Sequence, residues 1–177
     1  MATVKENAKT ETEKDTTQEK TEDTTILAET SGVKSILKTH VYLAAGMGLV
    51  PVPLVDLAGL TAIQLDMIYK LSKVYDVPFS KDRVKSIISS FAGSVAPVML
   101  TSSVASFLKI IPVVGAFAAP LAVGGTGAAF TYALGKVFIQ HYETGGNILN
   151  FDPVKMQEYF KEQFDKGKEY VSKLKKA

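Results

Sequence analysis

Ser86–Gly135 reads SIISSFAGSVAPVMLTSSVASFLKIIPVVGAFAAPLAVGGTGAAFTYALG and holds a single charged residue, Lys109. The charge divides this stretch into two uncharged runs, 86–108 and 110–135. A helix needs about 20 residues to cross the hydrocarbon core of a bilayer, so each run is long enough to span it. Because a lysine in mid-membrane is costly, Lys109 is expected at the tip of a helical hairpin.

The same two runs also fit the buried core of a soluble helical bundle. The first is rich in serine and threonine, and the second holds prolines and glycines that would kink or break a helix. Gly124 lies four residues before Ala128, and Gly127 lies four before Thr131. This spacing of small residues lets another helix approach closely. Both interpretations of the hydrophobic pair, membrane-embedded hairpin or soluble core, follow from the sequence.

Composition excludes several classes of function. The chain has 177 residues and no cysteine, so disulfides, thiolate chemistry and cysteine metal sites are excluded. Its net charge of +2 is too small to favour nucleic acid, and its lysines are interspersed with acids. The polar stretch 1–24 lacks the apolar core of a signal peptide, so we expect the N-terminus to stay in the cytoplasm.

Three segments are predicted along the chain. Residues 1–30 are polar and mildly acidic, which is typical of a disordered tail. Residues 31–151 are expected to form a hydrophobic helical domain, with the membrane hairpin at about 84–142. Residues 152–177 are expected to form an amphipathic C-terminal helix. The predicted fold class is therefore all-α.

Two helices have clear sequence signals. Apolar residues recur at three- and four-residue spacing from Leu57 to Tyr75, and a break at 77–80 follows, with Ser80 as N-cap of the next helix. A turn at Thr144–Asn147 (TGGN) is expected to end the hydrophobic region, and Asp152 and Pro153 then favour the start of a last helix from about Pro153 to Leu174. Its apolar stripe can pack back onto the domain or lie on a membrane surface.

No motif for catalysis or cofactor binding is complete. Gly135-Lys136 resembles the end of a phosphate-binding loop, but Phe130 stands where the upstream glycine is required. His40 and His141 are far apart in the sequence and have no carboxylate at metal-ligand spacing. We predict no catalytic residue, no cofactor and no metal site, and we expect that the protein is not an enzyme.

Asp56 is the polar residue that stands out in apolar surroundings. As a carboxylate in the first turn of a helix it would accept free backbone N–H groups and be favoured by the helix dipole. Alternatively, Asp56 and Gln64, two turns later, form a buried polar contact with another helix or subunit. Asp66 is assigned a lesser role, because Lys70 four residues on gives it an ordinary surface ion pair.

Two segments carry a family resemblance. Gly48–Asp56 (GLVPVPLVD), continuing through Gln64 and Tyr75, and Gly135–Glu143 (GKVFIQHYE) resemble the bacterial family catalogued as domain of unknown function 697. The resemblance covers roughly His40 to Lys168 and leaves out the acidic tail. Such domains are hydrophobic and helical, and occur on Era-like or dynamin-like GTPases or as free-standing proteins that accompany them at the inner membrane.

The resemblance implies a free-standing form, because the chain has no GTPase motif, and so a GTPase partner in trans. We predict a membrane-associated anchor or scaffold, with membrane lipid as a partner, as a homo-oligomer at the bacterial inner membrane with both termini cytoplasmic. The alternatives are a soluble helical interaction domain and a membrane-remodelling or pore-forming hairpin. The residues expected to make the helix–helix or partner contact are Pro51, Pro53, Asp56, Gln64, Gly124 and Gly127.

Overall fold

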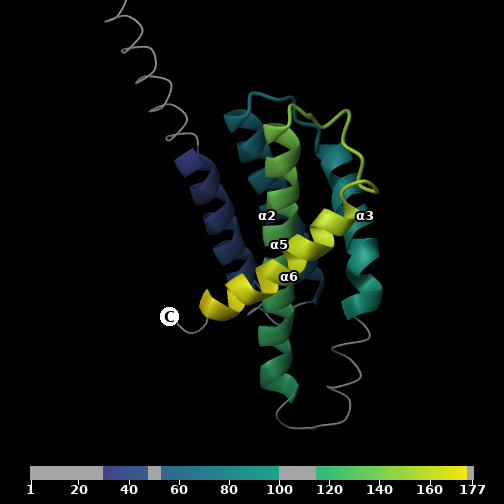
Figure 1. Cartoon of the computed structure of the whole chain (residues 1–177). Helices are drawn as coiled ribbons and strands as arrows, with labels where there is room; N and C mark the ends of the chain where they lie inside the picture. Colours follow the sequence, from purple (N-terminus) through teal and green to yellow (C-terminus); the bar gives the residue numbers. More distant parts are fainter. Residues whose placement is uncertain (1–29, 48–52, 100–114, 175–177) are drawn as a thin grey trace, which may run out of the picture. The chain divides into compact units, whose positions relative to one another are not determined.

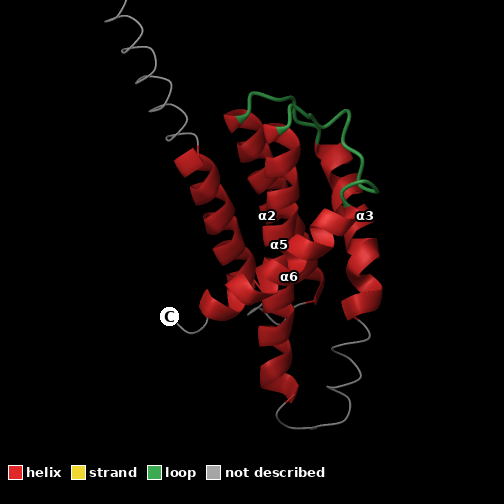
Figure 2. Ribbon diagram, in the orientation of Figure 1, coloured by secondary structure: helices red, strands yellow, loops and turns green. Residues whose placement is uncertain are grey.

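The computed structural model describes residues 30–47, 53–99 and 115–174, with side chains placed at 30–47, 58–94 and 125–174. The regular elements in these ranges are helices, and no strand occurs among them (Figure 2). The all-α fold class is thus confirmed. The chain divides into two compact units, Met1–Ser35 and Ile36–Ala177. Residues 30–35 of the first unit are helical.

The second unit is a bundle of helices. Residues 36–47 are helical, and are followed by α2 (Pro53–Val74), α3 (Lys81–Met99), α5 (Gly115–Glu143) and α6 (Gln157–Leu174). In Figure 1, α2 and α5 run in one direction, residues 36–47 and α3 run in the opposite direction, and α6 crosses α5 obliquely. The C-terminal end of α3 and the N-terminal end of α5 therefore lie at the same end of this unit.

Helix α2 has defined signals at both ends. It begins at Pro53, a residue whose fixed φ suits the first turn of a helix. It ends at Val74, and Asp76, two residues later, adopts a left-handed conformation with φ of 49°. The amide of Val77 donates to the carbonyl of Ser72 at 2.9 Å, which satisfies a free carbonyl of the last turn. The helix predicted from Leu57 to Tyr75 is confirmed, with an earlier start.

The predicted breaks on either side of the hydrophobic region are also confirmed. Ser80 directly precedes α3, and its carbonyl accepts from the amide of Val84 at 3.0 Å. Helix α5 ends in the same way as α2, with Gly145 at a φ of 79° and the Gly146 amide donating to the His141 carbonyl at 2.9 Å. Glycine suits this left-handed position because it has no Cβ.

The last helix begins later than predicted, at Gln157 instead of about Pro153. The Asp152 carboxylate accepts from the amides of Val154 at 3.0 Å and Lys155 at 3.4 Å. The Gln157 amide then donates to the Val154 carbonyl at 3.3 Å. Asp152 therefore caps a separate tight turn, and the regular helix starts only after it.

Helix α6 joins α3 to α5 through an aromatic core. The Phe160 ring is fully buried, stacks on Phe91 of α3 at 4.4 Å and meets Phe130 of α5 edge-on at 5.1 Å. Of the two alternatives for the last helix, the structure thus shows packing onto its own domain. Helix α3 packs on α2 and α6. The predicted hairpin did not include this contact of α6 with both α3 and α5.

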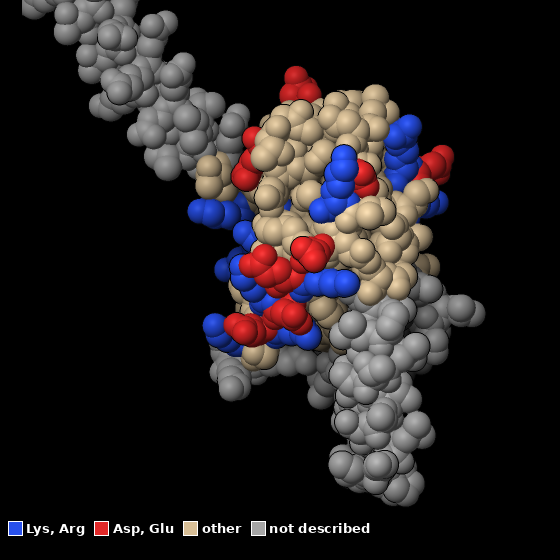
Figure 3. Space-filling model, turned by 45° about the vertical axis from the view of Figure 1, so that its right-hand side comes forward, with Lys and Arg blue, Asp and Glu red and all other residues tan. Residues whose placement is uncertain are grey.

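The outer surface of α6 carries paired charges. Glu162 and Lys166 are 2.6 Å apart, and Asp165 and Lys168 are also 2.6 Å apart. On the face drawn in Figure 3, basic and acidic side chains accordingly gather together. Exposed pairs of this kind contribute little to stability because solvent screens them, so the buried aromatic face is what holds α6 in place.

No helix in the described ranges combines the length and the apolarity that a membrane crossing requires. The predicted tip of the hairpin, Lys109, lies outside the described residues. That the hairpin at about 84–142 is embedded in a membrane stays a prediction.

Candidate functional site

Two of the predicted contact residues, Gln64 and Gly127, lie in a seam between α2 and α5. The Gln64 side chain is 2% exposed, and its Nε2 donates to Thr131 Oγ1 at 3.2 Å. Thr131 Oγ1 in turn donates to the Gly127 carbonyl at 2.9 Å. A Cβ added to Gly127 would lie 3.1 Å from Leu60 Cδ2, so the glycine allows a close approach of α2. We call these four residues, Leu60, Gln64, Gly127 and Thr131, the α2–α5 seam.

The seam fixes how α2 and α5 are aligned. Leu60 faces Gly127 and Gln64 faces Thr131, so both pairs advance by one helical turn. A buried amide that loses its partner costs about 1–3 kcal/mol, so sliding one helix along the other would be unfavourable. The α2–α5 seam therefore sets the register of two parallel helices.

The other predicted contact residues are only partly described. Pro53 is the first residue of α2, and Asp56 lies in its first turn. Gly124 lies within α5, one turn before Ala128. Pro51 and the side chain of Asp56 are outside the described residues. Thus the structure brings Gln64 and Gly127 together, and a functional role for all six residues stays a prediction.

A second polar cluster joins residues 36–47 to α2 and was missed by sequence reasoning. His40 is 1% exposed; its Nε2 lies 2.9 Å from Asp66 Oδ2 and its Nδ1 lies 2.6 Å from the Ile36 carbonyl. Each ring nitrogen thus has an oxygen partner. Lys70 Nζ also contacts Asp66 Oδ2 at 2.7 Å. The predicted Asp66–Lys70 pair is confirmed, but Asp66 also holds a buried histidine.

The electrostatics of this cluster favour an ionised Asp66. Hydrogen bonding from Lys70, and then from His40, lowers the pKa of the Asp66 carboxyl below its ordinary value of 3.8. The amino-acid pattern carries no signal for the His40 contact, because the two residues are far apart in the chain and neither matches a motif. Only the antiparallel packing of the two helices brings them together.

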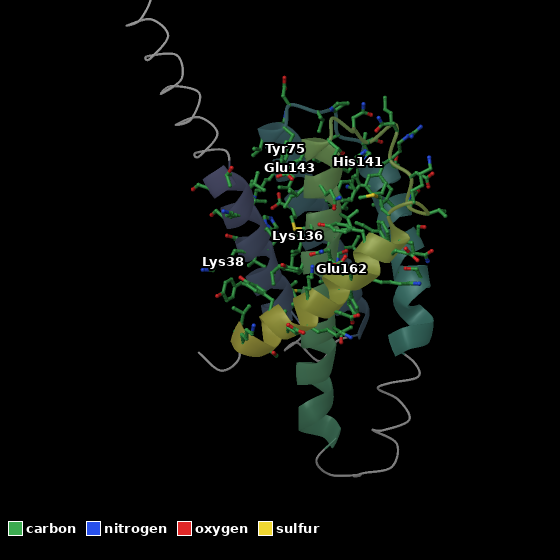
Figure 4. The ribbon with its side chains drawn as sticks, viewed as in Figure 1. Lys38, Tyr75, Lys136, His141, Glu143 and Glu162 are labelled. Carbon is green, nitrogen blue, oxygen red and sulfur yellow. The ribbon has the colours of Figure 1, made fainter. Side chains whose placement is uncertain are left out.

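The far end of the bundle has its own polar contacts. Tyr75 at the end of α2 donates to Glu143 Oε1 at 3.2 Å, and both are labelled at the top of Figure 4. His141 Nε2 lies 2.9 Å from the Asn147 carbonyl, so this histidine ties the end of α5 to the loop that follows. His40 and His141 therefore serve separate contacts.

Among the described residues, the polar side chains named above make packing contacts between helices or between a helix and a loop. Within residues 30–47, 53–99 and 115–174, no group of three or more His, Asp or Glu residues could hold a metal ion. Among the described side chains, the Tyr142 hydroxyl is buried without a hydrogen-bond partner. The Tyr142 ring packs against the rings of Tyr75 and Phe138, with the ring centres 5.6 Å and 5.7 Å apart. The polar clusters of the bundle hold helices together.

Comparisons with known proteins place this geometry in context. The sequence matches the family described as Domain of unknown function (DUF697) over residues 13–169. The match begins inside the tail, so the prediction that the family excludes the tail was wrong. The chain is also 42% identical over 143 residues to Magnetosome membrane protein 22 of Magnetospirillum gryphiswaldense, which covers 80% of this chain and 73% of that protein. No solved structure matches.

Proposed function

Because the chain belongs to the DUF697 family, we propose that it is a membrane-associated, non-enzymatic helical protein that acts as an anchor or scaffold through helix–helix packing. The observation that carries this proposal is the 42% identity, over most of the chain, to a protein named as a magnetosome membrane protein. Identity at this level over 143 residues favours a shared environment as well as a shared fold.

The sequence and the packing support the same proposal. Residues 86–135 contain one charge, which is the composition expected of a segment in contact with lipid. The buried polar pairs, Gln64–Thr131 and His40–Asp66, join helices to one another. A protein that works by holding helices in place needs this kind of contact and no reactive group.

The experiment that tests the proposal is fractionation of untagged protein expressed in bacteria, followed by alkaline carbonate extraction of the membrane pellet. We expect the protein to stay in the pellet and to need detergent for release. A protein that is soluble and monodisperse without detergent would instead support the alternative, a soluble interaction domain whose apolar helices are its own core.

The finer parts of the proposal concern topology and partners. We propose that the hairpin at about 84–142 contacts the inner membrane with both termini cytoplasmic, and that the protein forms homo-oligomers and accompanies a GTPase in trans. Crosslinking in intact cells followed by detergent purification tests both partnerships. Recovery of the monomer alone would count against them.

Pore formation is a separate alternative, which the glycine-rich α5 would suit. Conductance across planar bilayers distinguishes it from an anchor: stepwise currents would support a pore, and a flat trace at all voltages would favour the anchor.

A further inference from the structure

Four helical segments of the second unit, residues 36–47, α2, α3 and α5, lose their charges at one common level, whereas α6 is charged along its length. In the sequence, residues 41–65 and 86–135 contain two charged side chains, Asp56 and Lys109, and we call the described part of these ranges the charge-poor end. The remaining described residues of this unit, at the other end of the bundle and on α6, carry its other lysines, arginine and acids. Along the chain, these ranges have four boundaries, which lie between residues 40 and 41, 65 and 66, 85 and 86, and 135 and 136.

Contacts show that these four boundaries lie side by side. His40 Nε2 lies 2.9 Å from Asp66 Oδ2, and this contact aligns the boundary of residues 36–47 with that of α2. A Cβ added to Gly135, at the fourth boundary, would contact the side chains of Leu37 and Met67. The α5 boundary is therefore aligned with the other two.

The third boundary, on α3, is aligned through α6. Phe91 of α3 stacks on Phe160 at 4.4 Å, and Phe160 meets Phe130 of α5 at 5.1 Å. Because Phe91 and Phe130 each lie about one and a half turns inside the charge-poor end, the boundaries on these two helices are at the same height. Four helices with different sequences thus change from charged to uncharged at one plane.

Lysine–tyrosine pairs mark this plane on two helices. Lys38 Nζ lies 5.8 Å from the Tyr42 ring centre, and Lys136 Nζ lies 5.9 Å from that of Tyr132 (Figure 4 labels the two lysines). In both pairs the lysine lies on the charged side and the tyrosine, four residues away, lies on the charge-poor side. Tyr170 of α6 stacks on Tyr132 at 5.3 Å. Tyrosine and lysine in this order are typical of a membrane–water interface.

Helix α6 lies near the same plane. It crosses α5 where Gly167 approaches the backbone of Ala129, and it contacts α5 again at Phe130 and Tyr132. These α5 residues lie three to six residues inside the boundary at Gly135, which is about 4–9 Å along the helix, so the paired charges of α6 lie on the charge-poor side of the plane, at the depth of an interfacial helix among the headgroups.

We infer that the charge-poor end of the bundle is inserted into a lipid bilayer, with the Lys38–Tyr42 and Lys136–Tyr132 pairs at headgroup depth. This inference rests on the proposed membrane association and specifies how it is achieved. Lipid, and not a second copy of the chain, covers the charge-poor end, because a partner subunit would cover one face, whereas the charges stop on all four helices. Exposed positions of this end, among them Tyr42 at 46% and Leu43 at 51%, are uncharged.

The dimensions fit insertion without a crossing. From Tyr132 to Gly115, α5 extends about 26 Å, and from Phe91 to Met99, α3 extends about 12 Å. The hydrocarbon core is about 30 Å thick, so α3 would reach nearly to its middle and α5 across most of it. Asp56 lies in the first turn of α2, where free backbone N–H groups favour a carboxylate.

The absence of tryptophan from the chain permits a direct test. Leu43→Trp and Ala92→Trp place a fluorophore at exposed positions of the charge-poor end. Leu149→Trp and Val154→Trp are the matched controls, at exposed apolar positions in the loop between α5 and α6. Leu149 lies at the charged end, since Arg83 in the first turn of α3 donates to its carbonyl at 3.1 Å, and Val154 follows in the same loop.

Each full-length variant is mixed with vesicles of phosphatidylcholine and phosphatidylglycerol whose acyl chains are brominated, and flotation is measured with fluorescence. Circular dichroism first establishes that each variant is folded. We expect all variants to float, and only the Leu43→Trp and Ala92→Trp variants to shift to shorter wavelength and to lose emission through bromine quenching.

The other outcomes overturn the inference in distinguishable ways. Flotation with quenching only of the Leu149→Trp and Val154→Trp variants, or of none of the four, would leave the proposed membrane association intact and refute insertion of this end. A blue shift of the Leu43→Trp and Ala92→Trp variants without bromine quenching would assign the surface to a second copy. Failure to float would refute the proposed function together with the inference.

Discussion

Gly167 is the residue at which α6 comes closest to α5. A Cβ at this position would lie 2.8 Å from the carbonyl oxygen of Ala129 and 3.1 Å from its Cα. Both are backbone atoms, which cannot move aside as a flexible side chain could. Glycine is required here for the approach of two helices, whereas Gly93 on α3 has no atom within 4 Å of the corresponding position.

We therefore expect Gly167→Ala to lower the free energy of unfolding by about 1–3 kcal/mol, because the added methyl group overpacks the crossing. Gly93→Ala is the matched control and should raise it by about 0.5–1 kcal/mol, since alanine is the better helix former at an open position. Denaturant unfolding of both variants measures the difference. Equal effects of the two substitutions would contradict the close approach.

Asp66 carries the pH dependence of the contact between residues 36–47 and α2. Its pKa lies below the ordinary value of 3.8, so the carboxylate stabilises the fold above that pH, and the stabilisation is lost as the pH falls through the lowered pKa. The side chain is 49% exposed, so solvent screening limits the effect to about 1 kcal/mol or less.

Asp66→Asn should accordingly be less stable than the wild type at pH 7, and the difference should shrink as the pH is lowered from 5 toward 2. Lys70→Gln, which removes the largest cause of the shift, should reduce the same dependence in part. Thermal melting across this pH range provides the measurement. A stability difference that stays constant with pH would show that Asp66 does not carry it.

At the scale of elements, α6 is held by one aromatic face. Phe160 is fully buried between Phe91 and Phe130, while the charged pairs of α6 face outward. Phe160→Ala should destabilise the protein by about 3–5 kcal/mol and release α6 from α3 and α5. Lys161→Ala, at the adjacent exposed position, should change stability by no more than about 0.5 kcal/mol.

Denaturant unfolding measures both stabilities, and hydrogen exchange reports whether the α6 amides lose protection in the Phe160→Ala variant before those of α2. If α6 kept its protection, the helix would have to be held by contacts other than this aromatic face.

At the scale of the whole molecule, the four aligned charge boundaries give the second unit two chemically different ends. Lys38 and Lys136 lie just on the charged side of this plane. A lysine near an anionic membrane surface contributes about 1 kcal/mol of binding, so Lys38→Gln combined with Lys136→Gln should weaken binding to phosphatidylglycerol vesicles roughly tenfold or more.

The control for this prediction is Lys81→Gln combined with Lys155→Gln, which removes the same net charge at two lysines that belong to neither lysine–tyrosine pair. Lys81 begins α3 and Lys155 is paired with Asp152 at 3.6 Å in the loop before α6. Vesicle sedimentation at low salt measures both double variants. An equal loss of binding in the two would indicate that only net charge matters and not the position of the lysines.

Much of the local structure could be predicted from the sequence because it depends on near neighbours. The periodicity of 57–75, the break at 77–80 and the turn at Thr144–Asn147 each indicated an element end that the structure confirms. The start of α6 was placed too early, because Asp152 and Pro153 favour a tight turn as well as a helix.

The candidate site was only partly predictable. Gln64 and Gly127 could be selected because a polar amide on an apolar face and a glycine at small-residue spacing are local signals. Their partners, Thr131 and Leu60, and the contact of His40 with Asp66, depend on residues brought together from distant parts of the chain.

The sequence by itself determined the helical class, the position of several helix ends and the two long uncharged runs, since these follow from periodicity, capping residues and composition. Only the tertiary structure decided that α6 lies between α3 and α5, and that charges stop at one plane on four helices. The reason is that a helix pattern specifies which face is buried, but the height at which two helices align is set by pairs of residues far apart in the chain, such as Gln64 with Thr131.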